Sequence, residues 1–259
     1  MAALDDFSQS AAGAAPWTGA RNALVLVVAL VALWQALYLW IGDSALASPL
    51  QTVEYAARLF ASDTFWPHLT DTLKAFVAAY ALAVVLGLAL GFWLGFRRFA
   101  GEVAEPMVVA VYSLPKVTLY PILLLAFGLG ISARIAFGRL HGVIPIILFI
   151  LAAVRNVRPV LVKTGRVLRL PTLAMVRTIL LPAALPEILT GLRVGFSLTL
   201  IGTLLAEMFA SQRGLGFLLM NGIGLHNVPQ IMAVTLMIVT FAAGVSTLLL
   251  AVDRRLRRG

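Results

Sequence analysis

The chain has 259 residues, of which 61% are hydrophobic and 12% are charged, and its mean hydropathy is +0.97. Soluble domains are about 45–50% apolar and about 25% charged, so the composition excludes a soluble protein and predicts an all-α, polytopic membrane protein. The net charge of +9 does not indicate a nucleic-acid partner, because the basic residues lie between apolar segments and at the C-terminus, where orientation signals occur. The chain has no cysteine, and its three histidines are spaced too widely for a compact metal site, so no metal is expected.

Six segments are apolar enough to cross the lipid bilayer, which requires about 20 residues each. In chain order they are 23–41, 75–96, 104–127, 131–154, 188–209 and 231–252. The first could instead be a cleaved signal peptide, since Ala45-Leu46-Ala47 resembles a cleavage site. Its apolar core exceeds the usual ~7–15 residues and little positive charge precedes it, which favours an uncleaved span.

The basic residues orient this predicted bundle. Lysine and arginine concentrate on the cytoplasmic side of membrane proteins, and most of them fall on one side here if the N-terminus is cytoplasmic. The sequence therefore predicts two cytoplasmic tails, 1–22 and 253–259, around a six-span domain at 23–252. The connection 155–186 becomes the one long cytoplasmic loop. The segment 42–72 faces outward and contains either a short amphipathic helix or a simple connector.

The predicted spans contain several polar residues that bear on transport. Lys116 lies within the third segment, where a charge costs at least ~2.5–3.5 kcal/mol, so it either faces a transport pathway or reaches the interface by its stem. Tyr120 is a second pathway candidate, with Ser197 and Thr199 in the fifth segment, although these hydroxyls could bond to their own helix. Glu207, near the outer end of the fifth segment, is predicted to be an outer-gate or interface residue.

Three glycines, Gly87, Gly91 and Gly95, repeat every four residues along the second segment. Small residues at this spacing allow helices to approach closely. They predict either packing inside one subunit, which we favour, or a seam between two copies.

The loop 155–186 is long for a connection in a membrane bundle. Residues 160–170 have the pattern of a basic amphipathic helix, and residues 173–181 predict a second short helix. Pro182 and Pro186 predict that one helix stops near Leu181 and that the next starts at Pro186. Such a hairpin could dock to a partner or lie on anionic lipid.

The order of several motifs over roughly residues 48–225 resembles that of bacterial binding-protein-dependent ABC importer permeases, of the nitrate/sulfonate/taurine/bicarbonate branch. The residues that carry the resemblance are Ser113-Leu114-Pro115, Phe127-Gly128-Leu129-Gly130, Leu181-Pro182-Ala183-Ala184-Leu185-Pro186 with Ile188-Leu189-Thr190-Gly191-Leu192-Arg193, Ala206-Glu207-Met208, and Gly214-Leu215-Gly216. The resemblance implies a multi-pass, type I ABC importer permease-like bundle in the bacterial inner membrane. It implies import of a small anion such as a sulfonate, taurine, nitrate or bicarbonate.

The resemblance also implies partners. They are two cytoplasmic ABC ATPases, a second permease subunit (as a homodimer) and a periplasmic or lipid-anchored substrate-binding protein. The chain itself is expected to be no enzyme and to bind no cofactor, with ATP and Mg on the ATPases, and it has no Gly-x4-Gly-Lys-Ser/Thr motif. The predicted ATPase-coupling residues are Lys163, Gly165, Arg166, Arg169, Leu181, Pro182 and Pro186.

One half of the coupling motif departs from the family pattern, which is Glu-Ala-Ala, three residues, Gly, nine residues, then Ile-x-Leu-Pro. Counted back from Ile179, the Glu-Ala-Ala positions are Lys163-Thr164-Gly165, and the glycine position is Arg169. Either the partner ATPase differs to match this change, or the docking contact is carried by residues 173–186. Two rival functions also stay open: an ion-gradient-driven transporter, which predicts an intramembrane carboxylate near the bilayer centre, and a scaffold whose loop binds only lipid.

Overall fold

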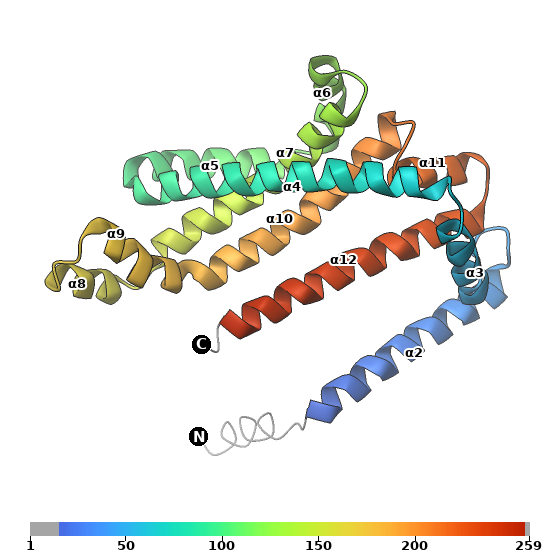
Figure 1. The fold of residues 1–259 in the computed structure, drawn as a ribbon, viewed down its shortest axis with the longest axis horizontal. Helices are drawn as coiled ribbons and strands as arrows, with labels where there is room; N and C mark the ends of the chain where they lie inside the picture. Colours follow the sequence, from blue (N-terminus) through green and yellow to red (C-terminus); the bar gives the residue numbers. More distant parts are fainter. Residues whose placement is uncertain (1–15, 257–259) are drawn as a thin grey trace.

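The computed structural model describes residues 16–256, and every regular element in that part of the chain is helical. The elements are α2 (Pro16–Ile41), α3 (Pro49–Phe60), α4 (Phe65–Phe96), α5 (Arg98–Ser113), the 3-10 turn η1 (Lys116–Leu119), α6 (Tyr120–Phe127), α7 (Ile131–Arg155), α8 (Pro159–Val167), α9 (Thr172–Met175), the π-helical segment η2 (Val176–Leu180), α10 (Leu181–Ala210), α11 (Leu215–Gly224) and α12 (Val228–Leu256), shown in Figure 1. The predicted all-α fold is confirmed. Of the two predicted tails, residues 1–15 and 257–259 lie outside the described residues.

The centre of the bundle is formed by α4, α7 and α10, which pack along most of their lengths. Three glycines of α4 each lie against a branched side chain of α7, in the pairs Gly87–Ile146, Gly91–Ile150 and Gly95–Val154. A Cβ added at Gly91 would lie 2.6 Å from Cβ of Ile150, so a side chain does not fit there without displacement. The glycine row therefore serves packing inside one chain, the interpretation that the sequence favoured.

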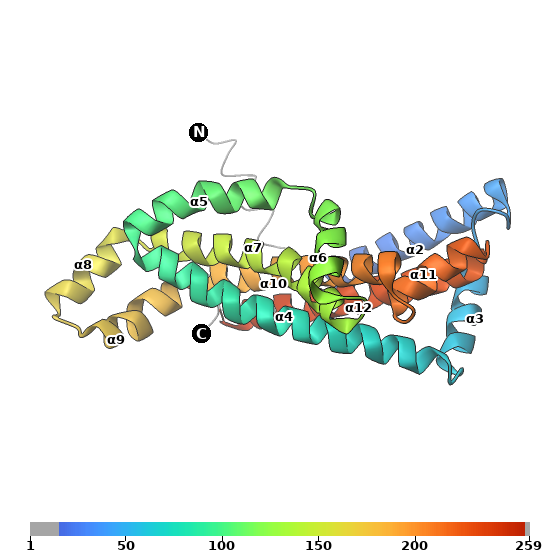
Figure 2. The same ribbon diagram turned by 90° about the horizontal axis from the view of Figure 1, so that it is seen from above.

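Within residues 16–256, five helices are long and apolar enough to cross a membrane: Arg21–Ile41, Phe65–Phe96, Ile131–Arg155, Val176–Ala210 and Val228–Ala251. The predicted third span at 104–127 is not one straight helix, because α5 and the η1–α6 segment meet at an angle of 87° (Figure 2). A proline disfavours the helical conformation of the residue before it, and Leu114 before Pro115 is extended, with φ −66° and ψ 140°. The bundle has six spans only if this bent pair counts as one.

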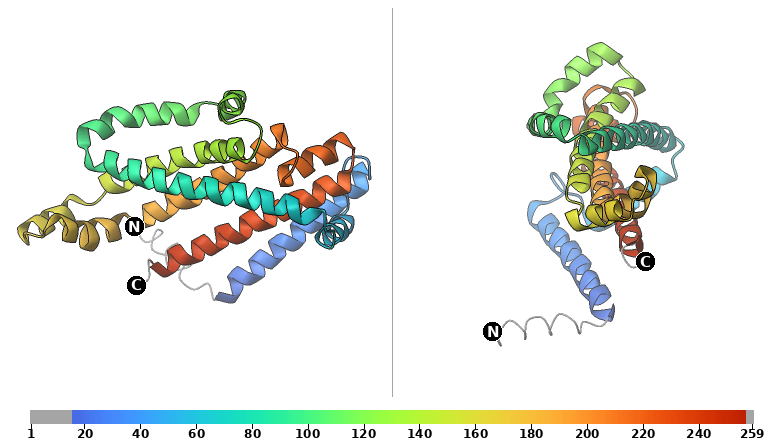
Figure 3. Two further views of the ribbon diagram at one scale, coloured as in Figure 1. Left: turned by 45° about the horizontal axis from the view of Figure 1, so that its top comes forward. Right: turned by 90° about the vertical axis from the view of Figure 1, so that its left-hand side faces the viewer.

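The first helix, α2, stands apart from the bundle and contacts mainly α3 (Figures 1 and 3). None of the apolar residues in its membrane-spanning part is buried against the rest of the described chain. Trp34 near its end donates a hydrogen bond from Nε1 to the carbonyl of Ala47, at 3.0 Å. This contact joins α2 to the start of α3, a helix that begins with Ser48 as a capping residue.

The two ends of the bundle differ in structure. At one end, α8, α9 and η2 form a hairpin that extends past the ends of α4 and α5 (Figures 1 and 2). We call residues 159–180 the basic hairpin. At the opposite end lie α3, α11 and the loop that joins α10 to α11 (Figure 1). This geometry places the long loop and the α10–α11 connection at opposite ends, whereas the side of the membrane that each faces stays a prediction.

Candidate functional site

The basic hairpin is held together by close packing at Gly165. This residue is buried, and an added Cβ would lie 2.8 Å from both Cδ1 of Ile179 and Cε of Met175. A glycine therefore lets α8 approach α9 and η2 closely. Pro159 occupies the first position of α8, where its missing N–H needs no helical partner.

The outer surface of the hairpin combines charge with exposed apolar side chains. Lys163 and Arg169 are exposed, and the side chain of Arg166 lies outside the described residues. Val167 is 81% exposed and Leu168 is 64% exposed. Apolar side chains at this exposure, beside basic groups, suit a surface that another molecule covers.

Arg169, two residues beyond the end of α8, has an unusual backbone conformation. Its φ is 52°, in the left-handed region, and the N–H of Leu170 bonds to the carbonyl of Gly165 at 3.0 Å. This is the hydrogen bond of a Schellman ending, where glycine is the usual left-handed residue. In the family pattern of the coupling motif, the position of Arg169 is a glycine, and the backbone at Arg169 has the conformation that favours glycine.

The predicted break between Pro182 and Pro186 is wrong. The helix continues without interruption from α9 through η2 into α10, with Pro182 in the first turn of α10 and Pro186 inside it. The π-helical segment explains this continuity, because the N–H of Leu181 bonds to the carbonyl of Val176, five residues back. This wider turn relieves the crowding that a proline ring causes in a regular α-helix. Leu181 and Pro182 are exposed at the start of α10, and Pro186 is half-buried.

Lys116 lies at the bend between α5 and η1 rather than in the middle of a helix. Its Nζ donates a hydrogen bond to the carbonyl of Tyr112 at 2.9 Å and lies 4.7 Å from the centre of the Tyr112 ring. The carbonyl and the aromatic face both favour the ammonium group. The half-buried Lys116 is thus held in place by its own turn of chain.

The other three pathway candidates occupy different environments. Tyr120 is buried, and its hydroxyl donates to the carbonyl of Ala206 at 2.8 Å. Thr199 has no exposure and donates to the carbonyl of Gly195 at 2.7 Å. Ser197 is half-buried and lines a 370 Å³ groove between α5, α10 and α12, which also includes Tyr112, Arg193 and Ser246. The structure does not bring the four candidates together, and only Ser197 borders this groove.

Glu207 is fully buried at the end of the bundle opposite the basic hairpin. One carboxylate oxygen accepts hydrogen bonds from the hydroxyl of Thr72, at 2.9 Å, and from the N–H of Gly216, at 3.0 Å. The other lies 3.4 Å from the guanidinium of Arg134. Glu207 thereby joins α4, α7 and α11 to its own helix, α10.

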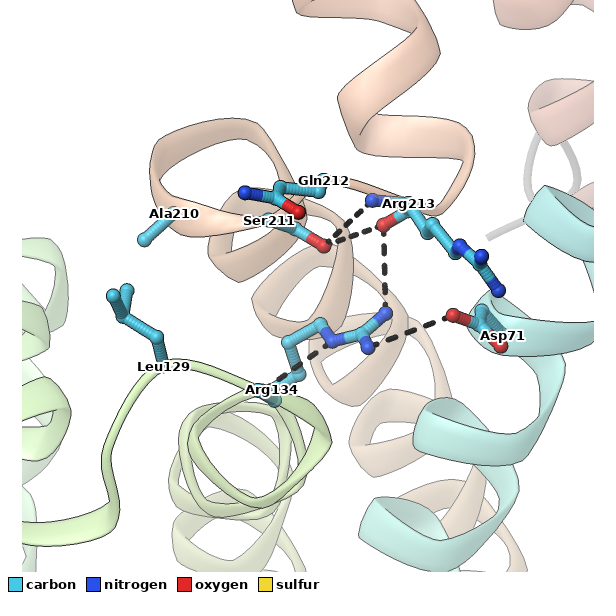
Figure 4. Close-up of a pocket in the computed structure, with 8 residues that line it drawn as sticks. Asp71, Leu129, Arg134, Ala210, Ser211, Gln212 and Arg213 are labelled. Atoms are coloured by element: carbon cyan, nitrogen blue, oxygen red, sulfur yellow. Dashed lines mark hydrogen bonds and ion pairs between the residues drawn. The ribbon is translucent and has the colours of Figure 1, made fainter.

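Arg134 extends this network to the surface. It points from α7 toward the α10–α11 loop and lines a pocket of 510 Å³, where it lies 3.8 Å from Asp71 and donates to the carbonyl of Arg213 at 3.5 Å (Figure 4). Gly214 has a φ of 118°, and an added Cβ would collide with the Glu207 carboxylate. We call Asp71, Thr72, Arg134 and Glu207 the outer polar cluster. It fastens the α10–α11 loop to α4 and α7.

The sequence alone missed the outer polar cluster as a unit. Thr72 and Glu207 are 135 residues apart, and Arg134 and Glu207 are 73 apart, so no local motif links them. The available signal was chemical: Arg134 and Glu207 are oppositely charged, and each lies at the same end of its predicted span. Opposite charges at one membrane depth are candidates for pairing.

Comparison with known proteins identifies the family. The sequence model described as "Binding-protein-dependent transport system inner membrane component" matches residues 83–259. The matched region includes the basic hairpin, α10 and α12. It also includes Arg134 and Glu207 of the outer polar cluster.

Curated relatives are transport permeases. The chain is 32% identical over 209 residues to the aliphatic sulfonates transport permease protein SsuC of Escherichia coli (strain K12), covering 80% of this chain and 77% of the relative. It is 30% identical over 209 residues to the riboflavin transport system permease protein RibX of Chloroflexus aurantiacus, covering 80% and 78%. It is 28% identical over 162 residues to the taurine transport system permease protein TauC of Escherichia coli (strain K12), a match that spans 59% of TauC and 62% of this chain.

Solved structures show the same fold. An inward-facing MetNI methionine ABC transporter chain superposes with a TM-score of 0.66 at 17% identity, over 75% of this chain and 99% of that chain. A chain of an amino acid ABC transporter superposes with a TM-score of 0.58 at 19% identity, over 81% and 99%. With the family match over 83–259, the chain belongs to the inner-membrane permease components of binding-protein-dependent ABC transport systems.

Proposed function

We propose that this chain is the membrane-spanning subunit through which an ABC importer moves a small anion, such as a sulfonate, taurine, nitrate or bicarbonate, across the inner membrane. ATP hydrolysis on a separate ATPase drives the movement, and this chain carries out no chemistry and binds no cofactor of its own. The observation that carries the proposal is the family match over 83–259 together with relatives named for aliphatic sulfonates and taurine.

The assembly that we propose contains two copies of this chain, two cytoplasmic ATPases and a substrate-binding protein. The basic hairpin supports the ATPase contact, because exposed apolar and basic groups lie together on a projecting surface. The coupling residues are those of the hairpin and the start of α10, from Lys163 to Pro186. The binding protein approaches the opposite end, where the α10–α11 loop lies.

In the mechanism that we propose, the hairpin and α10 move as one lever. Nucleotide binding closes the ATPases, and the hairpin follows them. The helix is continuous from α9 to the end of α10, so a displacement at the hairpin is carried into the bundle. Alternating access then requires two bundle states of similar free energy, between which ATP and the loaded binding protein shift the population.

Lys116 and Ser197 are the residues that we propose for contact with the anion. Lys116 supplies a positive charge at the bend of the third span, and Ser197 lines the groove beside Arg193. Tyr120 and Thr199 are buried in the chain and act by supporting α6, α7 and α10. Glu207 influences the outer gate through the loop that it anchors.

The gradient-driven alternative is disfavoured by membership in a family that depends on binding proteins. A coupling carboxylate must also exchange its ion with water, whereas Glu207 has no exposure and already pairs with Arg134.

Reconstitution tests the proposed function. The chain and the proteins that co-purify with it in mild detergent are placed in liposomes, and uptake of labelled taurine, an alkanesulfonate, nitrate and riboflavin is measured. We expect uptake of a sulfonate that requires ATP, is lost with a non-hydrolysable analogue and does not respond to an ion gradient. Uptake driven by a gradient without ATP would contradict the proposal, and ATP-driven uptake of riboflavin alone would contradict the anion class.

A further inference from the structure

The loop that contains the basic hairpin carries charge of one sign only. Residues 155–186 contain no aspartate or glutamate, and their basic residues are Arg155, Arg158, Lys163, Arg166, Arg169 and Arg177. Arg155, at the base, pairs with Glu105 of α5. The ion pairs found among the described residues include none at Lys163, Arg169 or Arg177. The projecting part of the hairpin therefore presents a positive surface that its own chain does not neutralise in the described structure.

The backbone conformation at Arg169 costs conformational free energy for any residue that has a Cβ. A left-handed backbone crowds the Cβ of any L-residue, and glycine adopts the same φ without that cost. Strained residues of this kind cluster at contact and switch sites, where the side chain serves a purpose. The side chain of Arg169 is exposed, so packing against the described residues does not account for an arginine at this position.

The position of the hairpin favours a protein partner over a lipid surface. The hairpin extends along the bundle axis past the ends of α4 and α5 (Figures 1 and 2), so its tip lies beyond the level of these helix ends. Val167 and Leu168, next to the basic residues at this tip, remain largely exposed. Lipid headgroups attract charge but cannot bury apolar side chains that project into water, whereas a groove with an apolar floor can do both.

We propose that Lys163 and Arg169 are charge-recognition residues for an acidic docking groove, in which carboxylates flank an apolar floor that covers Val167 and Leu168. The groove belongs to the cytoplasmic ATPase, so this inference rests on the proposed function and adds the chemistry of the partner. The guanidinium of Arg169 binds one carboxylate through two parallel hydrogen bonds, and the ammonium of Lys163 acts as a point charge toward another.

The test measures the affinity between the chain and the P-loop ATPase recovered with it, with the chain in nanodiscs of neutral lipid. The variants are Arg169→Gly, which removes the charge and relaxes the backbone, and Lys163→Glu with Arg169→Glu. Arg97→Glu, at an exposed position at the same end of the bundle, is the matched control. We expect the Arg169→Gly chain to melt no lower than the unaltered chain and to bind the ATPase about tenfold more weakly. We expect the double variant to bind the ATPase more weakly still. The Arg97→Glu control should change the affinity less than about twofold. Added salt should weaken binding between the unaltered chain and the ATPase.

A charge exchange completes the test. In the ATPase, the carboxylate residue that faces Arg169 is replaced by lysine. We expect this ATPase variant to bind the Arg169→Glu chain more tightly than the unaltered ATPase does, and to bind the unaltered chain more weakly. The inference is overturned if the variants bind the ATPase as tightly as the unaltered chain in these neutral-lipid nanodiscs. If the unaltered chain binds no ATPase at all, the proposed function fails as well, so the two failures are distinguishable.

Discussion

At the scale of single residues, Glu207 shows how a carboxylate can be placed inside a membrane bundle. A buried charge is stable only when it is paired and hydrogen-bonded, and Glu207 has both Arg134 and two hydrogen-bond donors. Gly214 leaves room for the carboxylate where the α10–α11 loop passes over it, and Gly216 lets the start of α11 approach the backbone of α10 closely. The pair therefore fixes the loop more than it adds net stability, since buried ion pairs repay little of their desolvation.

Removal of one partner of this pair has a large predicted effect. Glu207→Ala leaves Arg134 charged, buried and without its main acceptor, and we expect a loss of about 3–5 kcal/mol in the free energy of unfolding. Thermal unfolding in detergent measures this loss. Glu102→Gln removes the exposed pair with Arg98 and serves as the control, with an expected change of at most about 1 kcal/mol. Equal melting temperatures for the two variants would show that Glu207 does not anchor the loop.

The sequence predicts the membrane depth of a single residue better than it predicts the residue's contacts. The depth of Glu207 follows from its place in an apolar segment, whereas its partners come from α4, α7 and α11. Thr199 illustrates the same limit, because its hydroxyl bonds back to Gly195 on its own helix while its position against α7 follows from packing. Contacts between distant segments depend on how helices pack, which hydropathy does not contain.

At the scale of elements, apolar length predicted the spanning helices well and their breaks poorly. Burial of apolar surface and the need to satisfy every backbone group set where a helix must exist. Two proline sites then gave opposite results: Leu114-Pro115 ends α5 with a sharp bend, while Pro182 and Pro186 lie in a continuous helix. Whether a proline breaks a helix depends on neighbouring turns, such as the π-helical segment before Pro182, and no simple pattern encodes that turn.

Packing of α4 on α7 can be tested at its glycines. Gly91→Ala places a Cβ against Ile150, and we expect a loss of about 1–3 kcal/mol in stability from overpacking. Gly244→Ala in α12 is the matched control, because nothing lies within 4 Å of the added Cβ. The control should gain up to about 1 kcal/mol through helix propensity. The melting temperatures of the two variants measure this difference. A Gly91→Ala chain as stable as the Gly244→Ala chain would contradict the close packing of α4 on α7.

At the scale of the whole molecule, one end of the bundle carries the basic hairpin and the opposite end carries the outer polar cluster. The excess of lysine and arginine predicts that the basic end is cytoplasmic. Since the chain has no cysteine, single introduced cysteines can be labelled cleanly. In intact spheroplasts, a membrane-impermeant maleimide should label Arg213→Cys, and it should label Arg97→Cys only after permeabilisation. The reverse pattern would invert the predicted orientation.

The central claim is that the basic hairpin couples this permease to a separate ATPase, and crosslinking tests it most directly. Val167→Cys, at a position that is 81% exposed on α8, carries a photoactivatable crosslinker in native membranes, and Val85→Cys, at a position 63% exposed on α4, is the control. The account predicts an adduct between the Val167→Cys chain and a P-loop ATPase, identified by mass spectrometry, and no such adduct from Val85→Cys. Adducts from Val167→Cys with lipid alone, both with and without ATP, would contradict it.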